Sequence, residues 1–62
     1  MAVKKGEYVK VLVNYPKNKK VCGIFSGRVI ETGRFRTGYA YFRLDTCPEL
    51  ALPNSSKYVR RL

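Results

Sequence analysis

The chain has 62 residues, of which thirteen are Lys or Arg and four are Asp or Glu, with five Tyr, three Phe and no histidine. The net charge of +9 predicts a polyanionic partner, because such a field attracts phosphate backbones and acidic surfaces; the alternative is that the lysines only keep a small protein soluble. The hydrophobic fraction of 45% excludes disorder, and the length allows one small core, so residues 1–62 are expected to form a single domain.

Signals for export, membrane insertion and metal binding are missing from this sequence. No apolar run reaches the length of a membrane span, and the N-terminus lacks the apolar stretch of a signal peptide, so we expect a cytoplasmic protein. Cys22 and Cys47 are too few for a zinc site, which would normally also recruit histidine. We expect reduced thiols and no cofactor; a disulfide between the two cysteines is the alternative.

Period-two alternation of apolar residues dominates the first part of the chain. Val9, Val11 and Val13 recur at every second position, which predicts a strand over 7–14 with a β-branched face turned to the core. The segment 14–20 combines Pro and Asn with three lysines and predicts an exposed loop.

The middle of the chain predicts a bent strand followed by a hairpin. Segment 21–31 has strand character but contains Gly23 and Gly27, and glycines at such positions mark a bulge or a sharp bend where a sheet curls on itself. Segment 32–38, with glycine near both ends, predicts a hairpin loop into a strand over 38–45. One face of that strand carries Ala40, Phe42 and Leu44, and the other carries Tyr39, Tyr41 and Arg43.

The last part of the chain has room only for short elements. Pro48 and Pro53 bound a short strand near 49–52, segment 54–57 predicts a turn or one turn of tight helix, and 58–61 predicts a last strand. No helix longer than a turn or two is expected. The side chains that we assign to packing are Val9, Val11, Val13, Ile24, Phe25, Val29 and Ile30, with the alternation at Ile24 and Phe25 open because of the neighbouring glycines.

Two stretches resemble known small barrels. Residues 6–11 (Gly-Glu-Tyr-Val-Lys-Val), followed by Gly23 and by 27–30 (Gly-Arg-Val-Ile), resemble the opening of KOW-type barrels, and Leu52-Pro53 with Tyr58-Val59 is similar to the ending of signalling Src-homology-3 domains. The resemblance implies an all-β fold, a single small five-stranded SH3-like barrel, and it permits nucleic-acid binding. Proline-rich ligands are not expected, because the chain has no Trp and a lysine-rich loop. An oligonucleotide-binding five-stranded barrel is the alternative.

The segment Arg34-Phe35-Arg36 is the strongest local signal for function. Two guanidinium groups flank an aromatic ring at a predicted loop tip, and arginine grips phosphate while exposed rings stack on bases. The alternatives are that Phe35 packs into the barrel mouth and that the neighbouring tyrosines only cover a thin sheet. The candidate nucleic-acid-binding residues are Arg28, Arg34, Phe35, Arg36, Tyr39, Tyr41 and Arg43, with Lys17, Lys19 and Lys20 as a second basic cluster and Arg60 and Arg61 as a third.

We therefore expect a small nucleic-acid-binding protein that contacts phosphates of DNA or RNA with little base specificity. Catalysis is not expected, because the chain has no histidine and no glycine-rich loop leading into a helix. The alternative function is a protein-interaction module, such as a small subunit or an inhibitor, that docks on an acidic partner surface. A homodimer would bury more surface than so short a chain can bury alone, and stays open.

Overall fold

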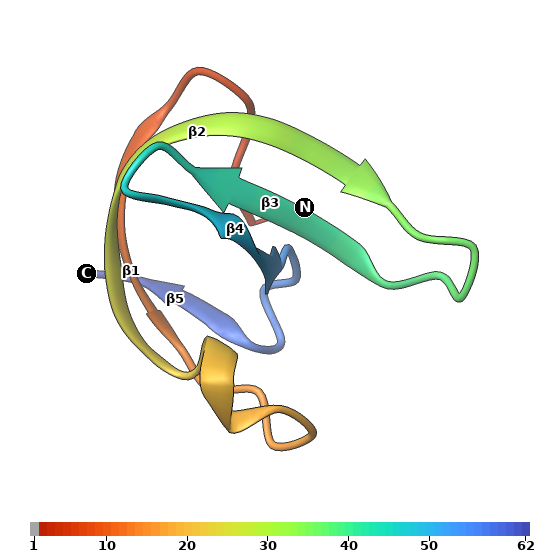
Figure 1. Ribbon diagram of the computed structural model, residues 1–62. Helices are drawn as coiled ribbons and strands as arrows, with labels where there is room; N and C mark the ends of the chain where they lie inside the picture. The colour runs from red at the N-terminus through yellow and green to blue at the C-terminus, as the bar shows by residue number, and fades with distance from the viewer. Residues whose placement is uncertain (1) are drawn as a thin grey trace.

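The computed structural model describes residues 2–62, and these form an all-β fold with five antiparallel strands (Figure 1). The elements are β1 (Tyr8–Val13), the 3-10 turn η1 (Lys19–Val21), β2 (Gly23–Arg34), β3 (Ala40–Leu44), β4 (Cys47–Pro53) and β5 (Val59–Arg61). All five predicted strands are confirmed. The largest differences in their limits are in β2, which starts after η1 and continues to Arg34, so the hairpin loop is shorter than predicted.

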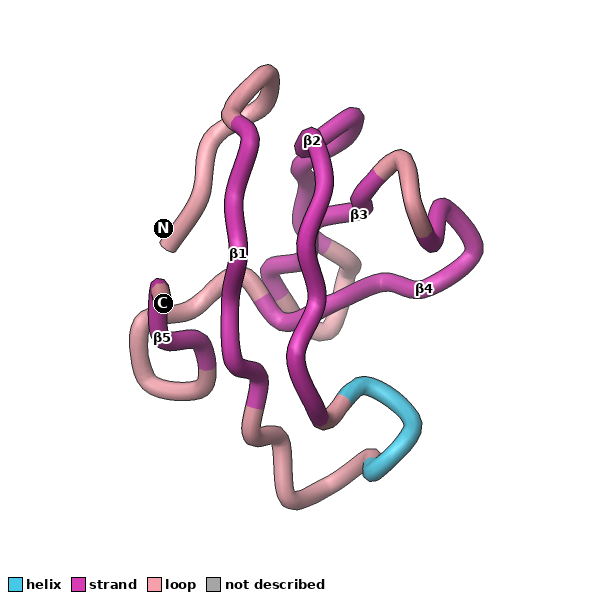
Figure 2. Tube along the Cα trace, turned by 90° about the vertical axis from the view of Figure 1, so that its left-hand side faces the viewer, coloured by secondary structure: helices cyan, strands magenta, loops and turns pink. Residues whose placement is uncertain are grey.

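The strands form one sheet in the order β4-β3-β2-β1-β5. The first half of β2 pairs with β1 and its second half pairs with β3, so this long strand belongs to both halves of the sheet. It curves strongly along its length, and β4 crosses the direction of β1 and β2 (Figures 1 and 2). The two ends of the sheet are β4 and β5, and pairing between them does not close the described strands into a barrel.

The bend in β2 depends on Gly27. Its φ of +147° is unfavourable for other residues, and a Cβ there would lie 2.5 Å from Asp45 Oδ1 and 2.9 Å from Thr46 Oγ1. The turn between β3 and β4 therefore rests directly on the backbone of β2. It is held there by hydrogen bonds from the Arg28 amide to Asp45 Oδ1 and from Thr46 Oγ1 to the Ser26 carbonyl.

The core lies on the concave side of the curved sheet. The predicted packing of Val9, Val11, Val13 and Val29 is confirmed, and Phe25 packs against the buried cluster. The other buried hydrophobic side chains are Val3, Val21, Phe42, Leu44, Leu52 and Val59. Apart from Phe42, the buried hydrophobic side chains are aliphatic, and Tyr15 and Phe25 are the partly buried rings that pack against them.

The prediction that Ile24 and Ile30 pack in the core was wrong. The exposed fraction is 63% for Ile24 and 40% for Ile30. Ile24 pairs with Leu12 on the outer face, because the inward positions of β2 are those of Phe25 and Gly27. Ile30 lies where the register between β2 and β3 shifts, so the bulge leaves it unpaired and turned outward.

The N-terminal segment is held against the sheet by Asn54, a buried polar residue at the start of the turn between β4 and β5. Its Oδ1 accepts hydrogen bonds from the amides of Ala2 (2.8 Å) and Val3 (3.0 Å), and its Nδ2 donates to the Val3 carbonyl (3.2 Å). The side-chain amide of Asn54 thus makes the hydrogen bonds to the backbone of Ala2 and Val3 that a neighbouring strand would make. Val3 is fully buried as a result.

Arg61 fastens the same segment from β5. Its Nη2 donates to the carbonyl of Ala2 (2.8 Å) and lies 3.1 Å from Glu7 Oε1. The hydrogen bond from Arg61, followed by that from the Lys4 amide, lowers the pKa of Glu7 below its ordinary value of 4.5. The contribution of this carboxylate to stability is therefore present above pH 4.5 and is lost as the pH falls through the lowered pKa.

Both cysteines are free thiols, so the alternative of a disulfide between Cys22 and Cys47 is not formed. The Cys22 thiol lies 3.2 Å from the Tyr15 carbonyl oxygen and 3.3 Å from the Tyr15 amide, which orders the loop after β1. Within residues 2–62 there is no helix with the length and apolar character needed to cross a lipid bilayer.

Candidate nucleic-acid interface

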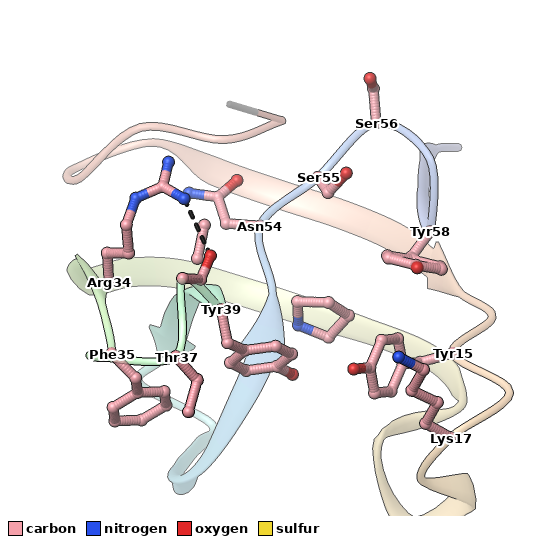
Figure 3. A pocket seen from close by; sticks show the side chains of 13 residues that line it. Tyr15, Lys17, Arg34, Phe35, Thr37, Tyr39, Asn54, Ser55, Ser56 and Tyr58 are labelled. Carbon is pink, nitrogen blue, oxygen red and sulfur yellow. Dashed lines mark hydrogen bonds between the residues drawn. The ribbon is translucent and has the colours of Figure 1, made fainter.

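An open groove of about 740 Å³ lies at one end of the molecule. Three segments surround it: the loop after β1, the β2–β3 hairpin and the turn between β4 and β5 (Figure 3). Its cations are Lys17 and Arg34, which stand at different ends of the groove (Figure 3). The other lining residues are Tyr15, Phe35, Thr37, Gly38, Tyr39, Ala40, Pro53, Asn54, Ser55, Ser56 and Tyr58. None of these lining residues is acidic.

Five rings form a continuous aromatic row, in the order Tyr58, Tyr15, Tyr39, Phe35 and Tyr41. The centroids of the first pair are 4.8 Å apart with the rings edge to face, and those of Tyr15 and Tyr39 are 5.6 Å apart. Phe35 stacks on Tyr39 at 5.8 Å and on Tyr41 at 4.5 Å. All these rings remain partly or largely exposed; four of them line the groove, and Tyr41 continues the row outside it.

The hairpin between β2 and β3 places Arg34, Phe35 and Arg36. The Phe35 amide donates to the Tyr39 carbonyl, and the Gly38 amide donates to the Phe35 carbonyl, which closes a tight loop. Gly38 has a φ of +89°, the conformation that favours glycine after such a turn. Arg36 therefore lies at the exposed tip.

The guanidinium of Arg34 is fixed at the groove rim. Its Nη1 donates to the Gly38 carbonyl at 2.8 Å, and the side chain reaches toward Asn54 (Figure 3). This bond uses one of several N–H donors, so the group keeps capacity for a phosphate. Phe35 is 43% exposed and stacks on Tyr39 and Tyr41, so it lies outside the buried core.

Tyr41 and Arg43 lie on the outer face of β3, outside the groove, where Glu31 partners both. The Tyr41 hydroxyl donates to Glu31 Oε2 at 2.6 Å, and Arg43 Nε lies 3.4 Å from Glu31 Oε1. Gly33 permits this arrangement, since a Cβ there would lie 2.9 Å from the Tyr41 hydroxyl oxygen. The hydrogen bond to Glu31 raises the pKa of Tyr41. This carboxylate offsets the Arg43 charge, so the pair serves mainly to cover the sheet.

The remaining predicted residues are placed elsewhere. Arg28 Nη1 donates to the Gly6 carbonyl at 2.8 Å on the half of the sheet formed with β1, and Arg28 does not line the groove. Lys19 and Lys20 are exposed on η1, next to the loop that carries Lys17. The structure thus brings together Lys17, Arg34, Phe35 and Tyr39, with Arg36 at the adjoining tip.

Two of the groove tyrosines were not predicted from the sequence. Tyr15 precedes Pro16 in the basic loop, and Tyr58 ends the turn before β5. Tyr15 contacts both Tyr58 and Tyr39, so the three rings come together from segments that are far apart in the chain. Burial, and then the neighbouring Tyr15 hydroxyl, raise the pKa of Tyr39, whose own hydroxyl donates to the Ala51 carbonyl at 3.1 Å.

Comparison of the chain with models of protein families, with curated proteins and with solved structures gives no significant match. Metal chemistry has no candidate ligand cluster either: residues 2–62 contain no group of three or more His, Cys, Asp or Glu side chains that could hold a metal ion.

Proposed function

We propose that the chain binds nucleic acid, mainly through phosphate contacts and with little base specificity. The observation that carries this proposal is the separation of charge: Lys17, Arg34 and Arg36 surround the groove end, and no acidic residue lines the groove. A surface of one sign next to a low-dielectric aromatic wall concentrates the field on an approaching phosphate backbone.

The arrangement of the acids supports the proposal. Three of the four are engaged away from the groove. The partners are Arg61 for Glu7, Arg43 for Glu31 and the Arg28 amide for Asp45. Since these carboxylates face other cations or amides, they do not offset the charge of Arg34 and Lys17.

Little sequence preference is expected, because contacts to phosphate carry no information about the base. Aromatic stacking is tolerant as well, since every base has a π-face. Arg34 supports this view, because its hydrogen bond to the Gly38 carbonyl holds a guanidinium at the rim of the groove, and such a group binds phosphate whatever the base.

A protein-interaction module, such as a small subunit or an inhibitor on an acidic partner surface, is the second candidate. It is favoured by a specific patch on the outer face of β1 and β2, where Tyr8 is 71% and Ile24 is 63% exposed. Lys10 lies between them on the same face. An apolar patch with cations near it is typical of a docking surface for an acidic protein.

We infer that the curved sheet is of the Src-homology-3-like, KOW-type barrel class. Support comes from the sharing of β2 between a β5-β1-β2 half and a β2-β3-β4 half, and from the glycine bend at Gly27. A cytoplasmic location is part of the same proposal, since free thiols such as Cys22 and Cys47 are typical of a reducing compartment.

A salt titration tests the proposed function. Affinity for nucleic acid should fall linearly in a log–log plot against salt, with a slope of about −0.7 to −0.9 for each phosphate contacted, and so roughly −2 to −3 for three cations. The measurement is fluorescence anisotropy with a labelled duplex and a labelled single strand at several salt concentrations, with poly-glutamate of similar charge as the control. Absence of nucleic-acid binding at low salt, with tight binding of poly-glutamate, would contradict the proposal and favour the acidic protein partner.

A further inference from the structure

We propose that the groove takes single-stranded nucleic acid, with unpaired bases stacked on the aromatic row and phosphates at Arg34 and Lys17. The inference rests on the proposed function and names the form of the ligand. It depends on two features of the groove end: the exposed rings and the positions of the two cations.

The aromatic row is larger than the fold requires. The hydrophobic core is completed by aliphatic side chains and Phe42, and of the five rings in the row only Tyr15 packs against that core. The row nevertheless assembles rings from separate segments of the chain, with neighbouring centroids 4.5 to 5.8 Å apart. Ring faces and edges left partly in water at one site offer a platform for flat ligands.

Bases expose their faces only when they are unpaired. In a duplex each base is stacked between its neighbours and offers only its edges, whereas single strands can spread their bases onto aromatic side chains. The groove is open to solvent and is lined by aromatic rings and two cations, so unpaired bases can lie against the rings with their phosphates near the charges. An aromatic groove with a basic rim therefore matches the single strand better than the duplex.

The two cations stand at different ends of the groove. At one end the Arg34 guanidinium reaches toward Asn54, while the Phe35 ring points the other way, and at the other end Lys17 lies beside Tyr15 (Figure 3). A backbone that crosses the groove between these ends would pass both charges.

Tyrosine emission gives a direct readout, because the chain has no Trp and four of its five tyrosines belong to the aromatic row. The probes are an oligothymidylate of ~12 nucleotides, within the usual range of site sizes, and a hairpin duplex with the same number of phosphates. The single strand should quench the emission and bind roughly tenfold more tightly than the duplex, the effect expected of one stacked base.

The test variants are Phe35→Leu and Tyr58→Leu, which keep apolar bulk while removing a ring, and the matched control is Tyr8→Leu on the exposed outer face. Each groove variant should lose about tenfold in affinity for the single strand with its salt slope unchanged, and the control should bind like the wild type. The far-ultraviolet circular dichroism spectrum checks that each variant folds. If Tyr58→Leu does not fold, Phe35→Leu alone tests the inference.

The outcomes separate this inference from the proposed function. Equal affinity for both probes, or no effect of Phe35→Leu, would overturn the single-strand inference while leaving nucleic-acid binding intact. Failure to bind either probe would overturn both. Quenching by an acidic peptide, with none by the oligothymidylate, would assign the groove to a protein ligand.

Discussion

Replacing Asn54 by Ala is expected to lower the free energy of unfolding by about 2 kcal/mol. The change removes the acceptor for the amides of Ala2 and Val3 and the donor for the Val3 carbonyl, and each buried group left unpaired costs roughly 1–3 kcal/mol. The N-terminal segment can instead detach into water, which loses the burial of Val3, about 1.5–3 kcal/mol. The less costly route, detachment of the segment, limits the loss to about 1.5–3 kcal/mol.

Such a loss is large for a chain of this size, whose total stability is on the order of 3–9 kcal/mol at ~0.05–0.15 kcal/mol per residue. Urea unfolding at neutral pH measures it. The matched control is Asn18→Ala, since Asn18 is exposed and its side chain caps η1 through the Lys20 amide, a contact of about 0.5–1 kcal/mol. Equal midpoints for the two variants would show that Asn54 does not hold the N-terminal segment.

Replacing Arg34 and Arg36 together by Ala is expected to weaken binding to every nucleic-acid sequence alike. The log–log salt slope should become shallower by about one to two units, because one or two phosphate contacts are lost. At low salt the affinity should fall roughly tenfold or more, or by at least about 1.4 kcal/mol. Both side chains are exposed on the hairpin, so the fold should be unaffected.

The control for the arginine pair is Lys10→Ala with Arg60→Ala, which removes the same charge from β1 and β5. Lys10 and Arg60 are exposed, and neither lines the groove. If only the overall charge matters, the two double variants will behave alike, and the assignment of the groove end is then wrong. A local site requires the hairpin variant to lose more affinity than the control.

Local patterns were sufficient to predict most of the fold. The alternation of Val9, Val11 and Val13, the glycine bend at Gly27 and the prolines near the two ends of β4 each act within a few residues, and all five strands occur close to where these signals predict them. The same reasoning failed at Ile30, because a bulge is a property of two paired strands and one strand alone does not reveal it.

That bulge also explains why the predicted site was divided. Continued pairing from Val29 and Leu44 would have placed Ile30 opposite Arg43, but the shifted register places Glu31 there. Glu31 then pairs with Arg43 and accepts a hydrogen bond from the Tyr41 hydroxyl. These two predicted binding residues therefore already have a partner within the protein. Neither the composition nor the alternation of the sequence indicates such a shift of one residue in the register between two strands.

The groove itself was beyond local sequence reasoning for a related reason. Tyr15 and Tyr58 contact each other, although one follows β1 and the other precedes β5. Asn54 was predicted only as part of a turn, and its bonds to Val3 span almost the whole chain. Such contacts depend on how the sheet brings distant loops to one end, and the pairing of β1 with β5 decides that.

The most direct test of nucleic-acid binding at the groove end is an amide chemical-shift titration of the ¹⁵N-labelled chain with the oligothymidylate. The account predicts that the shifts concentrate in residues 15–18, 34–39 and 54–58, the three segments that surround the groove. The amides of 8–12 and 24–28, on the opposite exposed patch, should move little. Shifts confined to that patch, with an unchanged groove, would contradict the account.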